Sequence, residues 1–211
     1  MEQKVVNLDT SYTQNRELSW LKFNERVLDE ASDDTVPPLE QLKFISIFTS
    51  NLDEFCMIRI GSLTDLSLLN EAPVDNKTGM TPKEQLRMVF KAIAPLCQKR
   101  DILYHQVETK LQKEGIFHLS AKSLEKKERK YIHQYFKEYI QPVLSPQIID
   151  VQHPFPHLAN KALYIVAALE DSKGKSFLGI LPVPPFLPEM IVIPPEGQSR
   201  SGVLFYVLLE E

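Results

Sequence analysis

The chain has 211 residues, of which 43% are hydrophobic and 25% charged, so it has the composition of a globular protein with one large or two small cores. Its 24 basic residues are outnumbered by 28 acidic ones, giving a formal net charge of -4. This balance argues against the basic field of a nucleic-acid-binding protein. No apolar run reaches the roughly 18 to 20 residues of a membrane span, which leaves peripheral membrane association open.

The two cysteines favour a reducing compartment. Cys56 and Cys97 have no Cys-x-x-Cys spacing, and the N-terminus lacks the basic start, apolar stretch and cleavage site of a secretory signal. The sequence therefore predicts a cytoplasmic protein with two free thiols that act as small buried hydrophobes.

The N-terminal part is predicted to be a loose arm followed by a helix. Residues 1–15 show no sustained period and would become ordered only by docking. From about residue 19 to 33, apolar residues recur at helical spacing, and Trp20, Phe23 and Leu28 share one face. Trp20 is interpreted as a core anchor rather than a ligand platform.

Residues 36–70 are predicted to form two helices that meet at Asn51, after a proline break at the start. The apolar period is interrupted only by the polar residues at positions 49–51. Asn51 followed by Glu54 fits a helix N-cap with a reciprocating carboxylate, and Ser50 with Asp53 is an alternative frame for the same cap.

A further helix is predicted after a polar loop at residues 71–80. Thr81 fits an N-cap, Pro82 the first helical position and Glu84 the N3 position of a capping box. Gly115 fits the C′ residue at the end of this helix, and Pro95 should kink or break it.

The fold class predicted is multi-domain, α followed by α+β. Residues 16–114 form an antiparallel bundle of four helices, and the pattern changes between about residues 108 and 120. Residues 115–211 combine a helix at 123–140 with short strands and are expected to be an incomplete α+β domain. The strands and the turn between two of them are expected at 116–119, 162–169, 171–174 (the turn), 177–183, 190–193 and 203–209.

Three segments carry a resemblance to a known family. They are Arg16-Glu17-Leu18-Ser19-Trp20-Leu21-Lys22-Phe23-Asn24-Glu25-Arg26-Val27-Leu28, then Asn51-Leu52-Asp53-Glu54-Phe55 with Arg59, and His153-Pro154-Phe155-Pro156-His157. The first two closely resemble the N-terminal domain of the bacterial polyphosphate kinases that form a phosphohistidine. The third resembles the signature near the start of that family's head, or middle, domain.

The resemblance implies a reversible transfer of the terminal phosphate of ATP to polyphosphate through a phosphohistidine, with Mg²⁺. In the family, the phosphorylated histidine and most phosphate and magnesium ligands lie beyond the part matched here. The chain would then be the front portion of a larger enzyme, inactive by itself and without catalytic or metal-binding residues of its own. The implied partners are ATP or ADP, polyphosphate and further copies of the chain in a dimer or tetramer, with a dimer contact through the head domain.

The resemblance also points to particular residues in this chain. An asparagine at the position matching Asn51 contacts ATP in the family, in a domain that covers the adenine side of the nucleotide. An amide suits that role, because it offers a donor and an acceptor without adding charge. The alternative is that Asn51 only caps a helix. Arg59 is a possible phosphate contact, or it pairs with Asp53, Glu54 or a neighbouring helix.

His153 and His157 are candidates for a catalytic histidine, but the sequence around them does not favour that role. The intervening prolines prevent an i, i+4 arrangement on a helix, so the spacing supports neither zinc binding nor a rigid nucleophile. No Gly-x-x-x-x-Gly-Lys loop occurs either. Two alternatives stay open: a non-catalytic helical interaction or dimerisation module, and a stand-alone phosphotransferase that uses one of these histidines.

Overall fold

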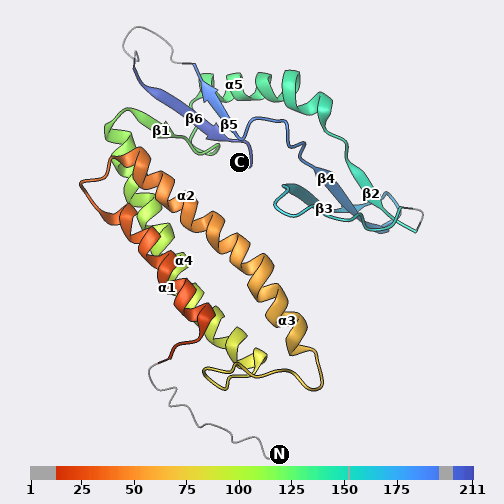
Figure 1. Cartoon of the computed structure of the whole chain (residues 1–211). Coiled ribbons are helices and arrows are strands. Elements are labelled where there is room, and N and C mark those ends of the chain that lie inside the picture. Colours follow the sequence, from red (N-terminus) through yellow and green to blue (C-terminus); the bar gives the residue numbers. More distant parts are fainter. Residues whose placement is uncertain (1–12, 152, 195–201) are drawn as a thin grey trace, which may run out of the picture. The chain divides into compact units, whose positions relative to one another are not determined.

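The computed structural model describes residues 13–151, 153–194 and 202–211, and divides the chain into two compact units, Met1–Glu114 and Gly115–Glu211 (Figure 1). Each unit is described by itself. Most of the predicted arm, residues 1–12, lies outside the described residues.

The first unit begins with helix α1, Arg16–Asp29, which continues into the 3-10 turn η1, Glu30–Ser32. Its N-cap is Asn15, whose side chain accepts hydrogen bonds from the backbone N–H groups of Glu17 and Leu18 at 3.0 and 3.2 Å. Asn15 is buried and also donates to the side chain of Gln85, 2.9 Å away. The helix therefore starts three residues earlier than the apolar period predicts, because a side-chain cap sets its beginning.

The predicted seam at Asn51 is wrong. Helix α2 runs from Pro38 to Phe55, passes into a π-helical segment, η2, at Cys56–Ile60, and continues as α3, Gly61–Ser67. Asn51 thus lies inside a continuous helix and is not an N-cap. The polar residues are accommodated within the helix, since the Thr49 hydroxyl donates to the Ile45 carbonyl and the Asn51 amide bonds across to α1.

Helix α4, Pro82–Lys113, begins as predicted. The Thr81 hydroxyl accepts from the Glu84 N–H, and the Glu84 carboxylate accepts from the Thr81 N–H, which forms a complete capping box. Gly115 follows with φ +83°, the left-handed conformation of a C′ glycine. Pro95 does not break α4.

In the described part of the first unit, three helical rods take the place of the predicted four: α1, the α2–η2–α3 rod, and α4 (Figure 1). Neighbouring rods α1 and α2, and α2 and α4, run antiparallel, and α4 packs against all the others. The core includes Leu21, Leu28, Phe48, Val89 and Val107. None of the described helices combines the length and apolar character that a membrane span requires.

The second unit holds two small sheets and a helix. One sheet has the order β1-β6-β5, with β1 parallel to β6 and β5 antiparallel to it. The other is antiparallel, in the order β2-β4-β3. Their strands are β1, Ile116–His118; β2, Gln147–Ile149; β3, Tyr164–Glu170; β4, Ser176–Pro182; β5, Met190–Ile193; and β6, Leu204–Leu208.

Helix α5, Lys126–Tyr135, extends through a second π-helical segment, η3, Phe136–Ile140, and a 3-10 turn, η4, Gln141–Val143. A buried cluster joins this helix to the first sheet and contains Leu124, Ile140, Ile191, Ile193 and Val207. The chain is thus helical at first and mixed α/β afterwards, as the sequence predicts.

Candidate functional site

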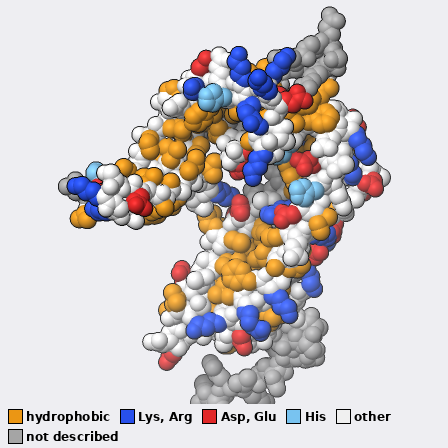
Figure 2. All heavy atoms as spheres, turned by 180° about the vertical axis from the view of Figure 1, so that it is seen from behind, with side chains coloured by type: hydrophobic (Ala, Val, Ile, Leu, Met, Phe, Trp, Pro, Cys, Tyr) orange, Lys and Arg blue, Asp and Glu red, His pale blue; other side chains and the backbone are white. Residues whose placement is uncertain are grey.

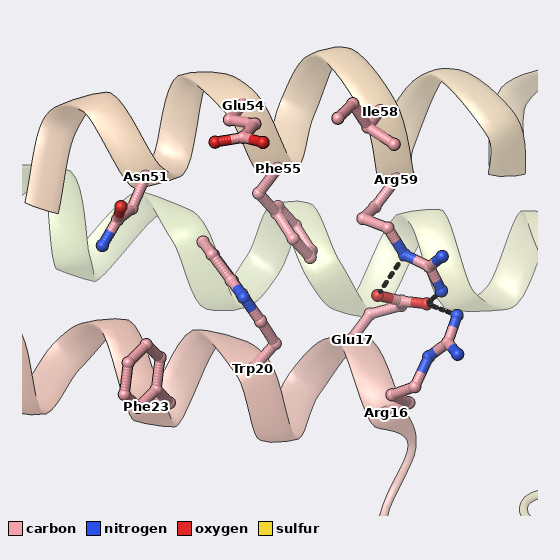
Figure 3. Close-up of a pocket in the computed structure, with 9 residues that line it drawn as sticks. All are labelled: Arg16, Glu17, Trp20, Phe23, Asn51, Glu54, Phe55, Ile58 and Arg59. Carbon is pink, nitrogen blue, oxygen red and sulfur yellow. Dashed lines mark hydrogen bonds and ion pairs between the residues drawn. The ribbon is translucent and has the colours of Figure 1, made fainter.

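A cavity of about 410 Å³ lies between α1 and the α2–η2 rod, within the first unit (Figure 3). Its volume is in the range of small-molecule sites. The α1 side contributes four residues and the α2–η2 side five. They are Arg16, Glu17, Trp20 and Phe23, and Asn51, Glu54, Phe55, Ile58 and Arg59.

At one end of the cavity, Asn51 points from α2 toward α1 (Figure 3). Its Nδ2 donates to Oδ1 of Asn24 at 3.1 Å, and Nδ2 of Asn24 donates to the carbonyl oxygen of Phe48 at 3.0 Å. Asn24 is fully buried. Two hydrogen bonds in series, from Asn51 to Asn24 and from Asn24 to the Phe48 carbonyl, therefore hold the side chain of Asn51; they are called the relay below.

The middle of the cavity is aromatic. The rings of Trp20 and Phe55 stack with centroids 4.3 Å apart and planes 8° from parallel (Figure 3). Phe55 is buried, whereas Trp20 is half-buried and Phe23 is 49% exposed. The prediction that Trp20 anchors the core is therefore incomplete, because its indole also forms part of a cavity wall. Flat apolar walls of this kind suit a planar ring.

The other end of the cavity carries charged groups. Glu17 accepts two hydrogen bonds from the Arg59 guanidinium, one of them from Nε at 3.1 Å, and Arg16 Nη2 lies 3.6 Å from the same carboxylate (Figure 3). Burial raises the pKa of the Glu17 carboxyl, and Arg16 opposes that shift. The two-point contact with Arg59 also favours the ionised form. Arg59 therefore pairs with a neighbouring helix, α1, which is one of the partners that the sequence left open.

The charges lining the cavity cancel. Arg16 and Arg59 bring two positive charges, and Glu17 and Glu54 bring two negative ones. A site that binds a triphosphate would need an excess of positive charge. The arrangement is better suited to the uncharged part of a ligand, such as a planar base that lies against the aromatic side chains with an amide at its edge.

The π-helical segment helps to shape the cavity. Eight residues of regular α-helix would turn Arg59 by about 80° away from the face of Asn51. A π turn holds more residues per turn, so Cys56–Ile60 reduces this rotation and brings Arg59 back toward that face. Such segments occur frequently at functional sites.

The residues singled out from sequence are only partly brought together. Asn51 and Arg59 line the same cavity. His153 and His157 belong to the second unit and are exposed, and His153 Nδ1 lies 2.9 Å from Asp150 Oδ1 in a local turn. Sequence reasoning did not assign Glu17 or Asn24 to the site. The available signal was their place near Trp20, at i−3 and i+4 on the same helix.

Among the residues that the structure describes, no three or more His, Cys, Asp or Glu side chains are grouped so that they could hold a metal ion. Both cysteines are free and partly buried, and burial raises the pKa of the Cys56 thiol.

Comparison with protein-family models gives two matches. Residues 13–119 match the polyphosphate kinase N-terminal domain, and residues 127–211 match the polyphosphate kinase middle domain. The two matches together cover both units of the structure.

Individual relatives agree with these matches. Polyphosphate kinase from Bacillus cereus is 45% identical over 218 aligned residues, covering 100% of this chain and 30% of that protein. The Synechocystis enzyme is 41% identical over 190 residues, covering 88% of this chain and 26% of its own length. The crystal structure of polyphosphate kinase from Porphyromonas gingivalis matches with a TM-score of 0.71 at 25% identity, over 92% of this chain and 29% of that one.

The chain thus spans about 30% of the length of the curated relatives it matches. Both the sequence motifs around the cavity and the fold of the two units are those of one family. This chain belongs to the polyphosphate kinase family, of which it contains the N-terminal and middle domains.

Proposed function

We propose that this chain is the N-terminal portion of a polyphosphate kinase and that the cavity between α1 and α2 holds the adenine side of ATP. The whole enzyme would transfer the terminal phosphate of ATP reversibly to polyphosphate through a phosphohistidine. The observation that carries the proposal is the cavity itself, in which Asn51 stands beside the Trp20–Phe55 stack. An amide edge and aromatic walls are the chemistry that a purine requires.

The charge balance supports a base-side rather than a phosphate-side role. Because Glu17 already occupies the guanidinium of Arg59, a phosphate would have to compete with a buried carboxylate for it. A phosphate contact by Arg59 stays a secondary proposal. The magnesium ligands and the phosphorylated histidine would come from residues outside this chain. The enzyme would act in the cytoplasm.

A homo-oligomer is the second part of the proposal. In β3, successive residues Ile165 and Val166 point to opposite faces of the sheet, and each is 54% exposed. Exposed apolar side chains occur on both units among charged ones (Figure 2). A strand whose apolar side chains are exposed on both faces fits the dimer contact implied for the middle domain.

The single tryptophan offers a direct test of nucleotide binding. Trp20 lines the cavity, so the intrinsic tryptophan fluorescence of this chain reports on that site alone. The chain would be titrated with ATP, adenosine and inorganic triphosphate, with excitation at wavelengths where adenine does not absorb. We expect ATP and adenosine to change the emission and triphosphate to leave it unchanged. A response to triphosphate alone would contradict a base site.

A kinetic test uses the full-length enzyme. We expect Asn51→Ala to raise KM for ATP several-fold while the catalytic histidine can still be phosphorylated. Ser50→Ala is the matched control, because Ser50 is exposed on the same helix and does not line the cavity. An unchanged KM in Asn51→Ala would count against the proposal. The 211-residue chain alone should bind nucleotide without making polyphosphate.

A further inference from the structure

We propose that Asn24, a buried residue outside the cavity lining, fixes the orientation of the Asn51 amide and so makes the site selective for adenine over guanine. This inference rests on the proposed function, since it assumes that a nucleotide base occupies the cavity. It assigns Asn24 as a positioning residue and names the feature of the base that is recognised, an exocyclic amine beside a ring nitrogen.

The relay begins at a backbone carbonyl. The oxygen of Phe48 only accepts hydrogen bonds, so the side-chain atom of Asn24 that faces it at 3.0 Å must be the NH₂ group. The Oδ1 of Asn24 is then directed to Asn51, and it too only accepts. Asn51 must therefore present its own NH₂ group at the 3.1 Å contact. The order of nitrogen and oxygen in both amides follows from this chemistry alone.

An asparagine whose amide can rotate freely discriminates poorly between adenine and guanine. By turning its amide through 180°, it would offer the donor where the acceptor had been and would fit adenine or guanine equally. The relay removes that freedom, because turning the amide of Asn51 would set its oxygen against the oxygen of Asn24. Asn24 is 0% exposed, so water does not compensate for the lost bond.

With the amide fixed, Asn51 presents Oδ1 and its second N–H to a ligand. Adenine has an N6 amino group that donates beside a ring nitrogen that accepts, which is the complementary order. Guanine carries the O6 acceptor in place of the amine and meets Oδ1 with an unfavourable pair of acceptors. The lining also holds two carboxylates. Glu17 is already paired with Arg59, and Glu54 is exposed to solvent, so competing water reduces its contribution to selectivity.

The test compares four nucleotides as phosphate donors for the full-length kinase: ATP, purine riboside triphosphate (which lacks the exocyclic amine), ITP and GTP. One net hydrogen bond is worth about 2- to 13-fold in a binding equilibrium. We expect kcat/KM for ATP to exceed that for purine riboside triphosphate by a factor in this range. The preference over GTP and ITP should be larger, since both place an oxygen opposite Oδ1.

Two variants then separate Asn51 from Asn24. In Asn51→Ala, ATP and purine riboside triphosphate should be used equally well, because the group that distinguishes them is gone. Asn24→Ala keeps the amide of Asn51 but frees it to rotate, so the preference for ATP over GTP should fall while GTP itself is used as well as before or better. The matched control is Gln41→Ala, which removes another fully buried amide of the same unit, bonded to Asp33 and Lys110 away from the cavity.

The outcomes distinguish the inference from the proposal on which it rests. If wild-type enzyme uses ATP and purine riboside triphosphate equally, or if Asn24→Ala keeps the full ATP preference, the relay does not set selectivity. If Asn51→Ala raises KM for all four nucleotides by the same factor, the base site stands and the inference is overturned. If Asn51→Ala changes KM for none of them, the base site itself is wrong. The nucleotide comparison in wild-type enzyme holds even if Asn24→Ala does not fold.

Discussion

At the scale of single residues, the site depends on polar side chains placed among apolar ones. Glu17 is the clearest example, because its side chain is only 8% exposed and it holds Arg59 on the opposite helix. A carboxylate in such a position is costly unless it is paired, and removing one partner leaves the other uncompensated.

A double-mutant cycle would measure this contact. We expect Glu17→Ala to lower the free energy of unfolding of the helical unit by about 1–3 kcal/mol, since it removes two hydrogen bonds and leaves Arg59 without its partner. Arg59→Ala and the double variant would complete the cycle in urea unfolding followed by circular dichroism. Glu40→Ala is the control, because Glu40 pairs with Lys43 at an exposed position and should cost at most about 0.5 kcal/mol. A coupling energy near zero between Glu17 and Arg59 would show that the contact contributes nothing.

The sequence revealed these residues unevenly. Asn51 and Arg59 could be selected because the family resemblance pointed to them, and the structure places both at one cavity. The sequence did not predict that Glu17 and Asn24 belong to the site. A charged or polar residue in an amphipathic helix is expected to face solvent unless the position of the neighbouring helix is known. Their partners lie 42 and 27 positions away along the chain, beyond the reach of local pattern.

At the scale of elements, local signals predicted best where the chain itself supplies the hydrogen bonds. The start of α4, the C′ glycine at 115 and the turn at 171–174 could be predicted, because caps and turns are made by neighbouring residues. The break expected at Asn51 was wrong, since polar residues can stay within a helix when side chains satisfy them across it. The π-helical segments and strand β2 had no local signal.

The capping box of α4 can be tested directly. We expect Thr81→Ala to destabilise the helical unit by about 1 kcal/mol, because it leaves a helix N-terminal N–H group without its acceptor. Thermal unfolding by circular dichroism would measure this effect. Thr109→Ala is the control, since Thr109 is an exposed threonine in the interior of the same helix. Equal effects of the two substitutions would contradict a capping role.

The box should also respond to pH. Hydrogen bonds from Thr81 hold the pKa of Glu84 below its usual value of 4.5. A lowered pKa means that the folded state favours the ionised form, so the contribution is present above the usual value and is lost as pH falls through the folded one. Glu84→Gln should therefore reduce stability at neutral pH and make less difference in acid. A pH-independent effect of this substitution would argue against the charged contact.

At the scale of the whole molecule, the second unit leaves the apolar side chains of one strand exposed. The chain spans about 30% of the length of its curated relatives. Apolar residues of β3 exposed on both faces of a three-stranded sheet fit a surface that another protein segment covers. The sequence pattern predicted β3 and β4, but not that β3 would stay exposed, because alternation does not show what packs on a strand.

The proposed oligomer contact gives a test at this scale. We expect Val166→Lys in the full-length kinase to reduce the molar mass measured by size-exclusion chromatography with light scattering, since it places a charge in an apolar contact. Ile102→Lys is the control, because Ile102 is 58% exposed on α4 in the other unit. Retention of the full mass by Val166→Lys would exclude the exposed face of β3 from the interface.

The wide turn at Cys56–Ile60 also affects how the chain should tolerate deletions. A π turn accommodates one surplus residue, so loss of the exposed Met57 would leave a regular helix with Leu63 still facing the core. Loss of Gln106 from the regular α4 would instead swing Val107 and Leu111 out of the core by about 100°. Melting temperatures of the two shortened proteins should differ widely, with only the first close to the parent.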